Sequence, residues 1–493
     1  MHQYAGALHC VVPRTWPSEP TRKGDTIVTL KAYSTLSRQK VEFVPLEPGK
    51  VRMYVCGPNL YDPCHVGHAM SYIVFDMVKR YLRYRGFAVK HVQNFTDIED
   101  RIIETARSLG TTIQELADRY IARFYTEMDA LNVERADHNP RATEVIPEII
   151  VMVEGLVEKG YAYRIEGDVY YRVTRFPAYG KLSRRNLEQM EAGARIEVDG
   201  RKEHPMDFAL WKSAKAGEPS WGSPWGDGRP GWHIECSAMS MKFLGEQLDI
   251  HGGGQDVIFP HHENEIAQSE AYTGKRPFVG HWMHNGLLKL REDDEKMTRH
   301  LGNFVSVQEA LKNHDPDAIR LFILSSHYRG PLTWTEDGVA ASERGAERLR
   351  VALRDAKAPP AVSPGDALCE EADAIRREYV SVMDDDLNSP RAIAQVFELA
   401  SIINQARDTG AASDSLAYAQ GILRELTQVL GLTLKGRAGP TEAEPFVALL
   451  VEVRRELRAS KQWALADSIR DRLIKLGVVL EDGSGGTSWK YTG

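Results

Sequence analysis

The stretch from Val51 to Arg85, VRMYVCGPNLYDPCHVGHAMSYIVFDMVKRYLRYR, contains the unit from which the fold can be predicted. Its opening residues up to Cys56 are mostly apolar and predict a buried strand, which Gly57-Pro58 ends. A polar turn follows, and the run from Ala69 to Arg85 has the periodicity of an amphipathic helix. The stretch therefore predicts a strand, a turn and a helix in succession.

The same order recurs directly downstream. Ala88 to Phe95 predicts a second strand, which runs into the polar Thr96-Asp97, and a helix is expected from Arg101. Strands that alternate with helices indicate a parallel sheet covered by helices, the Rossmann-type arrangement of α/β proteins. Ligands of such proteins collect at the carboxyl ends of the strands.

A second stretch, GWHIECSAMSMKFLGEQLDIHGGGQDVIFPHHENEIAQSEA from Gly231 to Ala271, carries a cysteine, a triple glycine and a dense polar run. Within it His261 and Glu265 are four residues apart, so on a helix they share one face. Thiol, imidazole and carboxylate groups are the donors that zinc prefers. The alternative is a solvated helix start beside a buried cysteine. The run is not the metalloprotease pattern HExxH, because Ile266 stands where the second histidine would be.

Residues that follow the predicted strands can be grouped into one site. Cys56, Thr96 and the loop at Gly252 each follow an apparent strand, so they can converge on one crevice. The candidate metal ligands are then Cys56, Cys236, His261 and Glu265.

The turn before the first helix predicts a phosphate site. His65 and His68 flank Gly67 at the first turn of the helix, where free N–H groups and positive potential attract anions. Gly67 would let a nucleotide approach the backbone closely. The histidines could donate to phosphate oxygens whose charge grows in a transition state. Alternatively, the two histidines only cap the helix.

Composition indicates a globular protein of about three domains. In 493 residues, 42% are hydrophobic and 27% charged, and no apolar run is long enough to cross a membrane. The chain has only five cysteines, an odd number, which argues against a disulfide framework. Reduced cysteines favour the cytoplasm as the compartment. The net charge of −7 gives no general affinity for nucleic acid, so an RNA partner would need local basic patches. We expect a monomer with no membrane partner.

Beyond the sheet, the pattern changes twice. Residues 131–211 look like an insertion between two halves of the sheet, and a charged loop follows the strand expected at His281–His284. From residue 337 amphipathic runs predict a helical bundle, and after a linker the last fifty residues predict a small α+β unit. Glu452 to Leu476 holds seven Lys or Arg against four Asp or Glu, a weak basic signal for RNA.

Four short motifs in order resemble those of the cysteinyl-tRNA synthetases, a family of class I aminoacyl-tRNA synthetases, from about Thr29 to the C-terminus. Pro58 to His68, ending Cys64-His65-Val66-Gly67-His68, resembles the HIGH signature, and Lys296-Met297-Thr298-Arg299-His300 resembles the KMSKS loop. Gly231 to Ser237 and Phe259 to Glu265 resemble the family's segments that carry zinc ligands.

The resemblance implies that Cys56, Cys236, His261 and Glu265 bind one Zn²⁺ that receives the thiolate of the substrate cysteine. Zinc binds a thiolate strongly and an uncharged alcohol poorly, so the metal would separate cysteine from serine without an editing site. Four protein ligands normally close a zinc site, so substrate would need a fifth position or a displaced ligand.

Further roles follow from the same resemblance. Trp232 and His233 would close over the bound cysteine, with Thr96 and Asp256 around its amino group. The phosphates of ATP, bound with Mg²⁺, would be held by the groups of the two signature motifs, catalysing adenylate formation by position and charge. These ATP-binding residues are His65, Gly67, His68, Lys296 and Arg299.

The implied activity is that of a cysteine–tRNA ligase: L-cysteine and ATP form cysteinyl-adenylate and pyrophosphate, and the cysteinyl group passes to the 3′ end of tRNA(Cys). The implied domains are an N-terminal extension of unknown role (1–28), a Rossmann-type catalytic domain (29–336), a helical tRNA-binding bundle (337–440) and an anticodon-binding unit (441–493).

Two departures from the family pattern leave alternatives open. Arg299 and His300 stand where the family usually has lysine and serine, and Ala69-Met70 stand where it commonly has Gly-Arg. Such changes could slow activation or alter the acceptor. One alternative is a ligase of the same fold that passes cysteine to a small amine, and another is an RNA-binding paralogue with weak catalysis.

Overall fold

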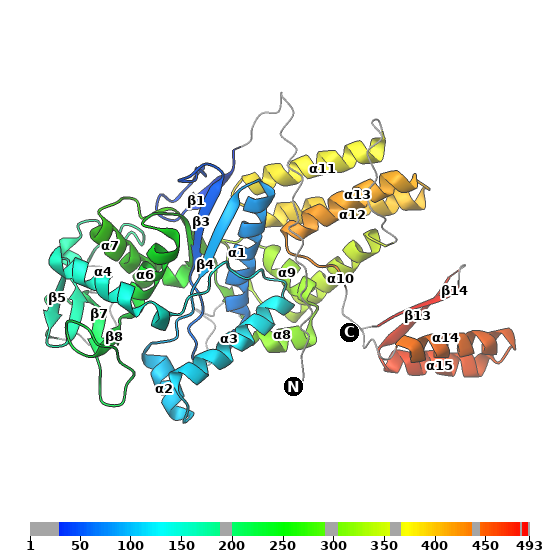
Figure 1. Ribbon diagram of the computed structural model, residues 1–493. Coiled ribbons are helices and arrows are strands. Elements are labelled where there is room, and N and C mark those ends of the chain that lie inside the picture. Colours follow the sequence, from blue (N-terminus) through cyan, green and yellow to red (C-terminus); the bar gives the residue numbers. More distant parts are fainter. Residues whose placement is uncertain are drawn as a thin grey trace, which may run out of the picture.

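The structure is a computed structural model of the chain, and it describes residues 29–187, 200–290, 304–354, 366–435, 444–483 and 486–491. Its centre is a four-stranded parallel sheet in the order β10-β9-β3-β4 (Figure 1). The strands are β3 (Lys50–Val55), β4 (Ala88–Gln93), β9 (Leu248–Gly254) and β10 (Val279–Asn285). The predicted α/β class with a parallel sheet is confirmed.

Both faces of the sheet are buried. In β3 the side chains of Met53 and Val55 join one core cluster, whereas Tyr54 between them joins a second cluster on the opposite face. Successive strand residues point to opposite faces, so a strand covered on both sides is apolar throughout. This explains why the run from Val51 to Val55 does not alternate with polar residues, apart from Arg52 near its start.

Helices supply the two covers. The helix α1 (Val66–Tyr84) packs on one face, and α6 (Trp232–Leu244) with α7 (Glu263–Thr273) packs on the other (Figure 1). The helix α1 begins at Val66, earlier than the expected start at Ala69, because His65 caps it. The smaller elements around the sheet are β1 (Lys31–Ser34), β2 (Gln39–Glu42), α2 (Asp100–Ser108), α3 (Ile113–Ala130), β11 (Leu288–Lys289), α8 (Val307–Asn313), α9 (Pro316–Leu324) and β12 (Leu332–Thr333).

The insertion is a helix and an antiparallel sheet in the order β5-β6-β7-β8. Its elements are α4 (Ile146–Glu158), β5 (Ala162–Ile165), β6 (Asp168–Tyr171), β7 (Phe208–Ser213) and β8 (Gly228–Pro230). The sheet continues past the expected end at Trp211, because β8 pairs with β7 and places Pro230 opposite Trp211. The antiparallel sheet therefore leads directly into α6 at Trp232.

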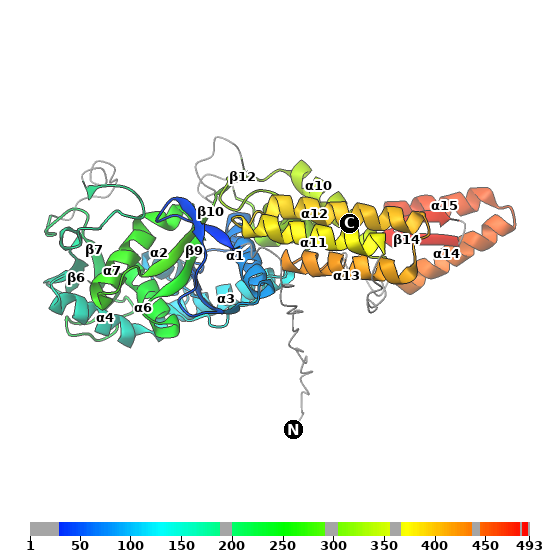
Figure 2. The same ribbon diagram turned by 90° about the horizontal axis from the view of Figure 1, so that it is seen from above.

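A helical bundle follows the sheet in the chain, as the amphipathic runs predict (Figure 2). Its helices are α10 (Glu336–Ala352), α11 (Ala367–Asp384), α12 (Ser389–Asp408) and α13 (Ser413–Val429). The core cluster that contains α1 also contains apolar residues of α10 to α13, so the bundle and one face of the sheet share a core. Among the described residues, no helix combines the length and the apolar character needed to span a membrane.

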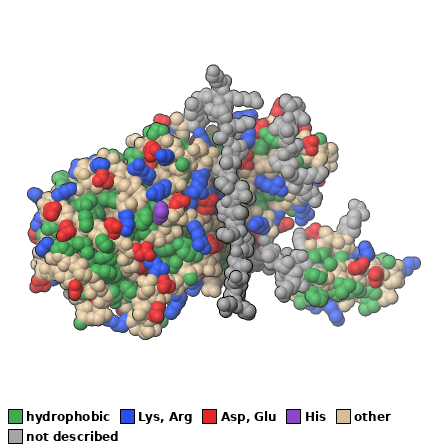
Figure 3. Space-filling view, viewed as in Figure 1, with side chains coloured by type: hydrophobic (Ala, Val, Ile, Leu, Met, Phe, Trp, Pro, Cys, Tyr) green, Lys and Arg blue, Asp and Glu red, His purple; other side chains and the backbone are tan. Residues whose placement is uncertain are grey.

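The C-terminal unit has a small core of its own, made by Val447, Leu473, Val478 and Leu480. It consists of α14 (Glu444–Ala459), α15 (Trp463–Lys475), β13 (Val478–Gly483) and β14 (Gly486–Tyr491). Both helices and the first strand are as predicted, whereas the antiparallel partner strand β14 was not. Large apolar side chains, including Phe446 and Trp463, stay exposed on this unit, and Figure 3 shows apolar surface there.

Candidate active site and metal centre

The candidate metal ligands come from the edge of the sheet and from the cover formed by α6 and α7. Cys56 directly follows β3, and its backbone N–H donates to the carbonyl of Gly252 in β9 at 3.1 Å. The triple glycine therefore lies inside the end of β9 and not in a loop after it, because Gly252 pairs with Val55. A side chain at Gly252 could not fit, since its Cβ would lie 2.2 Å from the ring of Phe75.

The four predicted ligands meet at this edge. One ligand atom from each of Cys56, Cys236, His261 and Glu265 lies within 4.8 Å of all the others. His261 Nε2 is 3.1 Å from Glu265 Oε1, and Cys56 Sγ is 4.0 Å from the same oxygen. The helix start from His261 onward is buried, so the alternative of a solvated helix start is wrong.

The acidic groups of this cluster have a cationic partner in the protein, because Cys236 and Glu265 raise the pKa of His261 to about 10 against the effect of its burial. The pKa of the Cys236 thiol is held well below its usual value, because Cys56 donates a hydrogen bond to it, and the same contact raises the pKa of Cys56. Burial and the nearby Cys236 raise the pKa of Glu265 to about 8. Glu265 Oε2 is buried without a hydrogen-bond partner in the described part of the chain. Two sulfurs, an imidazole and a carboxylate oxygen so arranged suit Zn²⁺.

Two histidines that the sequence interpretation did not assign lie in the same cluster. His251 and His262 form a second possible donor set together with Cys56 and Glu265. His262 Nε2 is 3.2 Å from Cys56 Sγ, and its Nδ1 is 2.7 Å from His284 Nε2. The set with two thiols is the softer one, which favours it for zinc. The position of His251 before the triple glycine, at the same strand end as Cys56, is the signal that could have found it.

The residues predicted to surround the cysteine substrate lie against the candidate ligands. The ring of Trp232 lies 4.3 Å from that of His261 between centroids, and His233 Nδ1 is 2.9 Å from His261 Nδ1. Burial lowers the pKa of His233 well below its usual value, so its imidazole stays neutral. Asp256 follows β9, and its charge contributes to the raised pKa of Cys56.

Thr96 reaches the same edge from β4. Its hydroxyl accepts from Asn94 Nδ2 at 3.2 Å, and the amide oxygen of Asn94 accepts from the backbone N–H of Gly57 at 2.9 Å. A side chain at Gly57 would collide with the carbonyl of Asn94, so glycine is needed there for the close approach. Thr96 is therefore fixed beside the residue that follows Cys56.

The histidine turn forms a reciprocal cap at the start of α1. His65 Nδ1 accepts from the backbone N–H of His68 at 3.2 Å, and His68 Nδ1 accepts from that of His65 at 3.3 Å. The two histidines therefore do cap the helix. With Nδ1 accepting, the proton of each neutral ring is on Nε2. The two rings stack with centroids 3.7 Å apart.

The KMSKS-like residues Lys296, Met297, Thr298, Arg299 and His300 lie outside the described residues. The segment from Phe304 onward is described and contacts the histidine turn. Val66 N donates to the carbonyl of Val305 at 3.0 Å, and Val307 N donates to that of Cys64 at 3.0 Å. Ala69 and Met70, which depart from the family pattern, are fully buried core residues.

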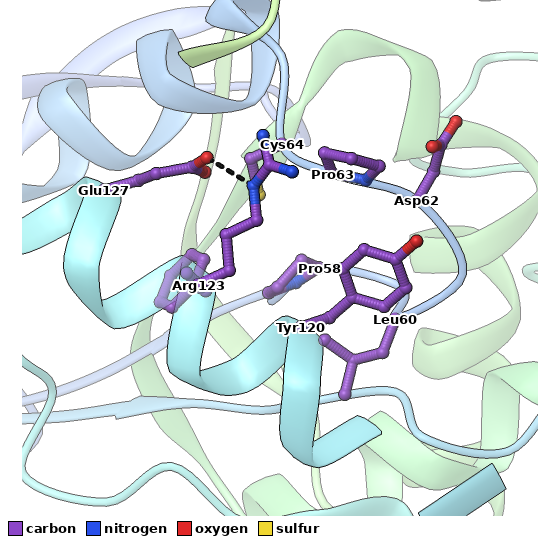
Figure 4. Close-up of a pocket in the computed structure, with 9 residues that line it drawn as sticks. Pro58, Leu60, Asp62, Pro63, Cys64, Tyr120, Arg123 and Glu127 are labelled. Atoms are coloured by element: carbon purple, nitrogen blue, oxygen red, sulfur yellow. Dashed lines mark hydrogen bonds and ion pairs between the residues drawn. The ribbon is translucent and has the colours of Figure 1, made fainter. Parts of the chain in front are cut away.

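Beneath the histidine turn lies a small cavity lined by Cys64, Arg123 and Glu127 (Figure 4). Arg123 Nε donates to Glu127 at 2.6 Å, and burial raises the pKa of the Cys64 thiol. Cys64 therefore remains a protonated, structural cysteine.

Two family models match the chain: "tRNA synthetases class I (C) catalytic domain" over residues 42–344 and "DALR domain" over residues 378–435. Among curated relatives, the cysteine–tRNA ligase of Dehalococcoides mccartyi (strain BAV1) is 52% identical over 94% of this chain and 99% of its own length. That of Pelotomaculum thermopropionicum is 49% identical over 94% of this chain and 100% of its own.

Solved structures share the fold at low identity. The methionyl-tRNA synthetase of Mycobacterium tuberculosis, in complex with methionyl-adenylate, aligns over 82% of this chain and 94% of its own, with a TM-score of 0.55 and 16% identity. The leucyl enzyme (LeuRS) of Agrobacterium radiobacter K84, in a ternary complex with tRNA, aligns over 82% of this chain and 87% of its own, with a TM-score of 0.57 and 12% identity.

Proposed function

This chain belongs to the cysteine–tRNA ligase family, and we propose that it selects its amino acid through one zinc ion held by Cys56, Cys236, His261 and Glu265. Its activity is that of an aminoacyl-tRNA synthetase that joins cysteine to tRNA. The observation that carries the proposal is the convergence of those four donors, three of them buried, at the carboxyl edge of the parallel sheet, within 4.8 Å of one another.

Zinc, when bound, would supply a thiol-selective ligation site, because it binds a thiolate far better than an alcohol. The protein supplies the rest. Thr96 and Asp256 would fix the amino group of the substrate, and Trp232 would cover it. The neutral imidazole of His233, beside His261, adds no positive charge that would compete with the metal for the substrate.

The phosphates of ATP, with Mg²⁺, would occupy the turn before α1. Because His65 Nδ1 and His68 Nδ1 accept from the backbone, their Nε2–H groups would be the ones that donate to phosphate oxygens. Lys296 and Arg299 would approach from the segment that precedes Val305, which contacts the same turn. The cysteine carboxylate then attacks the α-phosphate, and catalysis consists of positioning and charge stabilisation.

The finer assignments extend to the remaining parts of the chain. We propose that residues 337–440 and 441–493 hold tRNA(Cys), with the last unit at the anticodon, and that the enzyme works in the cytoplasm as a monomer. The division into domains at residues 29, 337 and 441 is part of this proposal.

The test is the charging of purified tRNA(Cys) with labelled cysteine, run beside an assay with a bare amine acceptor. Charging of tRNA alone is expected, whereas ligation to the amine would favour the small-acceptor alternative. Cysteine-dependent exchange of pyrophosphate into ATP separates both from an RNA-binding paralogue, which would show none. With cobalt in place of zinc, added L-cysteine should change the sulfur-to-metal charge-transfer band; an unchanged spectrum would remove the metal from substrate recognition.

A further inference from the structure

The two cysteines of the candidate metal centre are close enough to react with each other. Their sulfur atoms lie within 4.8 Å of one another. Cys56 directly follows β3, Cys236 lies in the first half of α6, and α6 packs against β3. Two other cysteines that the structure describes, Cys64 and Cys369, belong to neither donor set at this site. The fold therefore holds Cys56 and Cys236 together as a pair of thiols.

Solvent reaches the two thiols to different extents. Cys56 is partly exposed, whereas only 1% of Cys236 is exposed. A small oxidant therefore meets Cys56 first, and Cys236 is the second thiol behind it. An accessible thiol next to a resolving partner is the arrangement of redox-sensing cysteines, in which the first sulfur is oxidised and the second completes a disulfide.

Side-chain rotation is enough to bring the two sulfurs together. A disulfide has its sulfurs about 2.05 Å apart, so a gap of about 3 Å at most has to close. A change between staggered rotamers of one cysteine moves its sulfur by about that distance. The backbone of Cys56 can keep its place during this rotation, with its N–H on the carbonyl of Gly252.

Oxidation of this pair would remove the sulfur donors from the metal centre. Among the described residues two donor sets could hold a metal ion, and Cys56 belongs to both of them. The set favoured for zinc also contains Cys236, so a disulfide would leave it only His261 and Glu265. Zinc takes cysteine as the thiolate, and two remaining donors are too few for its tetrahedral coordination. The ion would therefore leave the oxidised site.

We propose that Cys56 and Cys236 are a peroxide-sensitive pair, and that their oxidation to a disulfide releases the zinc ion and stops the selection of cysteine. This inference goes beyond the proposed function but rests on its zinc ligands. Because a disulfide is reversed by exchange with other thiols, the pair would make cysteine activation depend on the redox state of the surroundings.

The oxidant is hydrogen peroxide, and the reaction has two steps. First, Cys56 Sγ bonds to one peroxide oxygen, the O–O bond breaks, and the other oxygen leaves as water, which gives a sulfenic acid. Then Cys236 Sγ bonds to Cys56 Sγ, the S–O bond breaks, and a second water leaves. Each water takes one proton, from a thiol or, for a zinc-bound thiolate, from solvent. Each sulfur loses one electron, and the peroxide gains two.

The first experiment follows zinc and thiols together in the full chain. Zinc-loaded protein without added cysteine is treated with hydrogen peroxide, and a chromogenic chelator measures the released zinc. Zinc should be released as the thiols of the denatured protein fall from five to three. Peptide mapping should find Cys56 joined to Cys236. Zinc that stays bound, or zinc release with the two cysteines oxidised separately to sulfinic acids, would overturn the proposal.

Two variants test the order of the steps. In Cys236→Ser the second thiol is missing, so a 1,3-diketone that traps sulfenic acids should label Cys56. Cys56→Ser should stay unlabelled under the same brief treatment, because its remaining thiol is buried. The matched control is Cys369→Ser, which should release zinc and form the disulfide as the wild type does. Equal labelling of the two variants would overturn the order. The mapping of wild-type protein decides if circular dichroism shows that a variant has not folded.

Reduction separates this proposal from the proposed function. After treatment with dithiothreitol and zinc, the oxidised protein should regain its metal and its cysteine-dependent pyrophosphate exchange, because a disulfide is reducible and a sulfinic acid is not. If the wild type holds no zinc before any oxidation, the proposed function fails at its metal, whatever peroxide does. If the protein holds zinc and activates cysteine, but peroxide neither releases the metal nor joins the two cysteines, only the redox pair is overturned.

Discussion

At the scale of single residues, the candidate metal centre holds buried acids that face a single cationic side chain, His261, whose pKa they raise to about 10. Glu265 and Cys236 are fully buried acids beside each other, and one raises the pKa of the other. Isolated charges are expensive in a protein interior, so a group of acids is stable there only with a positive partner. A divalent cation is the partner that fits two sulfurs, an imidazole and a carboxylate.

The first prediction concerns that cation. Cys236→Ser should lose bound zinc and abolish cysteine-dependent pyrophosphate exchange, because a hydroxyl is a poor zinc ligand. Elemental analysis of the dialysed protein measures the metal directly. The matched control is Cys369→Ser, a buried cysteine of α11, which should retain zinc. Full zinc in Cys236→Ser would remove Cys236 from the ligand set.

The second prediction concerns His91, a buried histidine of β4 with no hydrogen-bond partner on either ring nitrogen within the described chain. Burial, with nearby Lys79, lowers its pKa from 6.5 to about 3. Between these values the unfolded chain binds a proton that the folded chain does not, so stability is present above pH 6.5 and is lost as the pH falls.

Each pH unit in that window costs about 1.4 kcal/mol of unfolding free energy. His91→Gln should therefore lose less stability than the wild type between pH 6.5 and pH 5, by about 1–2 kcal/mol, in urea unfolding. The control substitution is His138→Gln, at an exposed histidine. Parallel pH profiles for His91→Gln and the wild type would show that His91 is not a buried neutral group.

At the scale of elements, the start of α1 combines a structural and a chemical task. His65 and His68 cap the helix with one ring nitrogen each, which fixes the proton on the other nitrogen. Gly67 between them has no room for a side chain, because a Cβ there would lie 2.8 Å from the ring of His65. The turn thus depends on a glycine for its geometry and on two histidines for its donors.

The third prediction tests this turn. Gly67→Ala should displace the His65 ring and lower the rate of adenylate formation by about tenfold or more, the scale of one lost charge-stabilising donor. Rapid-quench measurement of the first turnover reports that step alone. The control is Gly222→Ala in the insertion, where the nearest atom to a new Cβ is 3.8 Å away. Equal first-turnover rates for Gly67→Ala and the wild type would contradict the phosphate role of the turn.

At the scale of the whole molecule, one buried arginine, Arg320, links the helix α1 on the sheet to the bundle. Arg320 of α9 and Asp76 of α1 are fully buried and 2.6 Å apart. Arg320 also donates to the carbonyl of Leu430, the residue that ends α13, and to that of Leu131, which ends α3. One guanidinium therefore fixes the ends of two helices against the helix that carries the histidine turn.

The fourth prediction follows from that pair. Arg320→Leu should lower the unfolding free energy by about 3–5 kcal/mol, because it leaves buried carbonyls and Asp76 short of a partner. Urea unfolding of both variants gives the comparison. The matched control is Arg391→Leu, whose exposed pair with Glu378, at 3.4 Å, should contribute less than about 1 kcal/mol. Similar losses in the two variants would make the buried pair no more important than a surface one.

The fifth prediction concerns the C-terminal unit. Truncation after Pro440 removes α14 to β14, which have their own core. Because none of the predicted cysteine or ATP residues lies in this unit, activation should be unchanged, while charging at low tRNA concentration should fall by about tenfold or more. A tRNA(Cys) with a changed anticodon should distinguish the two proteins. Its charging should be poor with the full chain compared with normal tRNA(Cys), whereas the truncated chain should charge both alike. Equal charging by both would remove the anticodon role.

Local pattern was enough for most elements. The apolar run at Val51, the helical period after Ala69 and the amphipathic runs of the bundle predict the strands and helices that the structure contains, since each signal is short-range. The four candidate ligands were also predictable, because residues that follow parallel strands share one edge and because the motifs resemble a known family.

Tertiary structure alone decided which other groups join them. His251, His262 and His284 lie in one cluster because β9 pairs with both β3 and β10. Neither pairing can be predicted from the residues of one strand alone. A cavity lined by Glu99 and Lys212 likewise needs the insertion folded against the start of α2. The sequence by itself determined the elements and the chemistry at their ends, because propensity and periodicity act over a few residues. Only the packed fold decided which distant side chains meet, because burial and strand order bring together residues far apart in the chain.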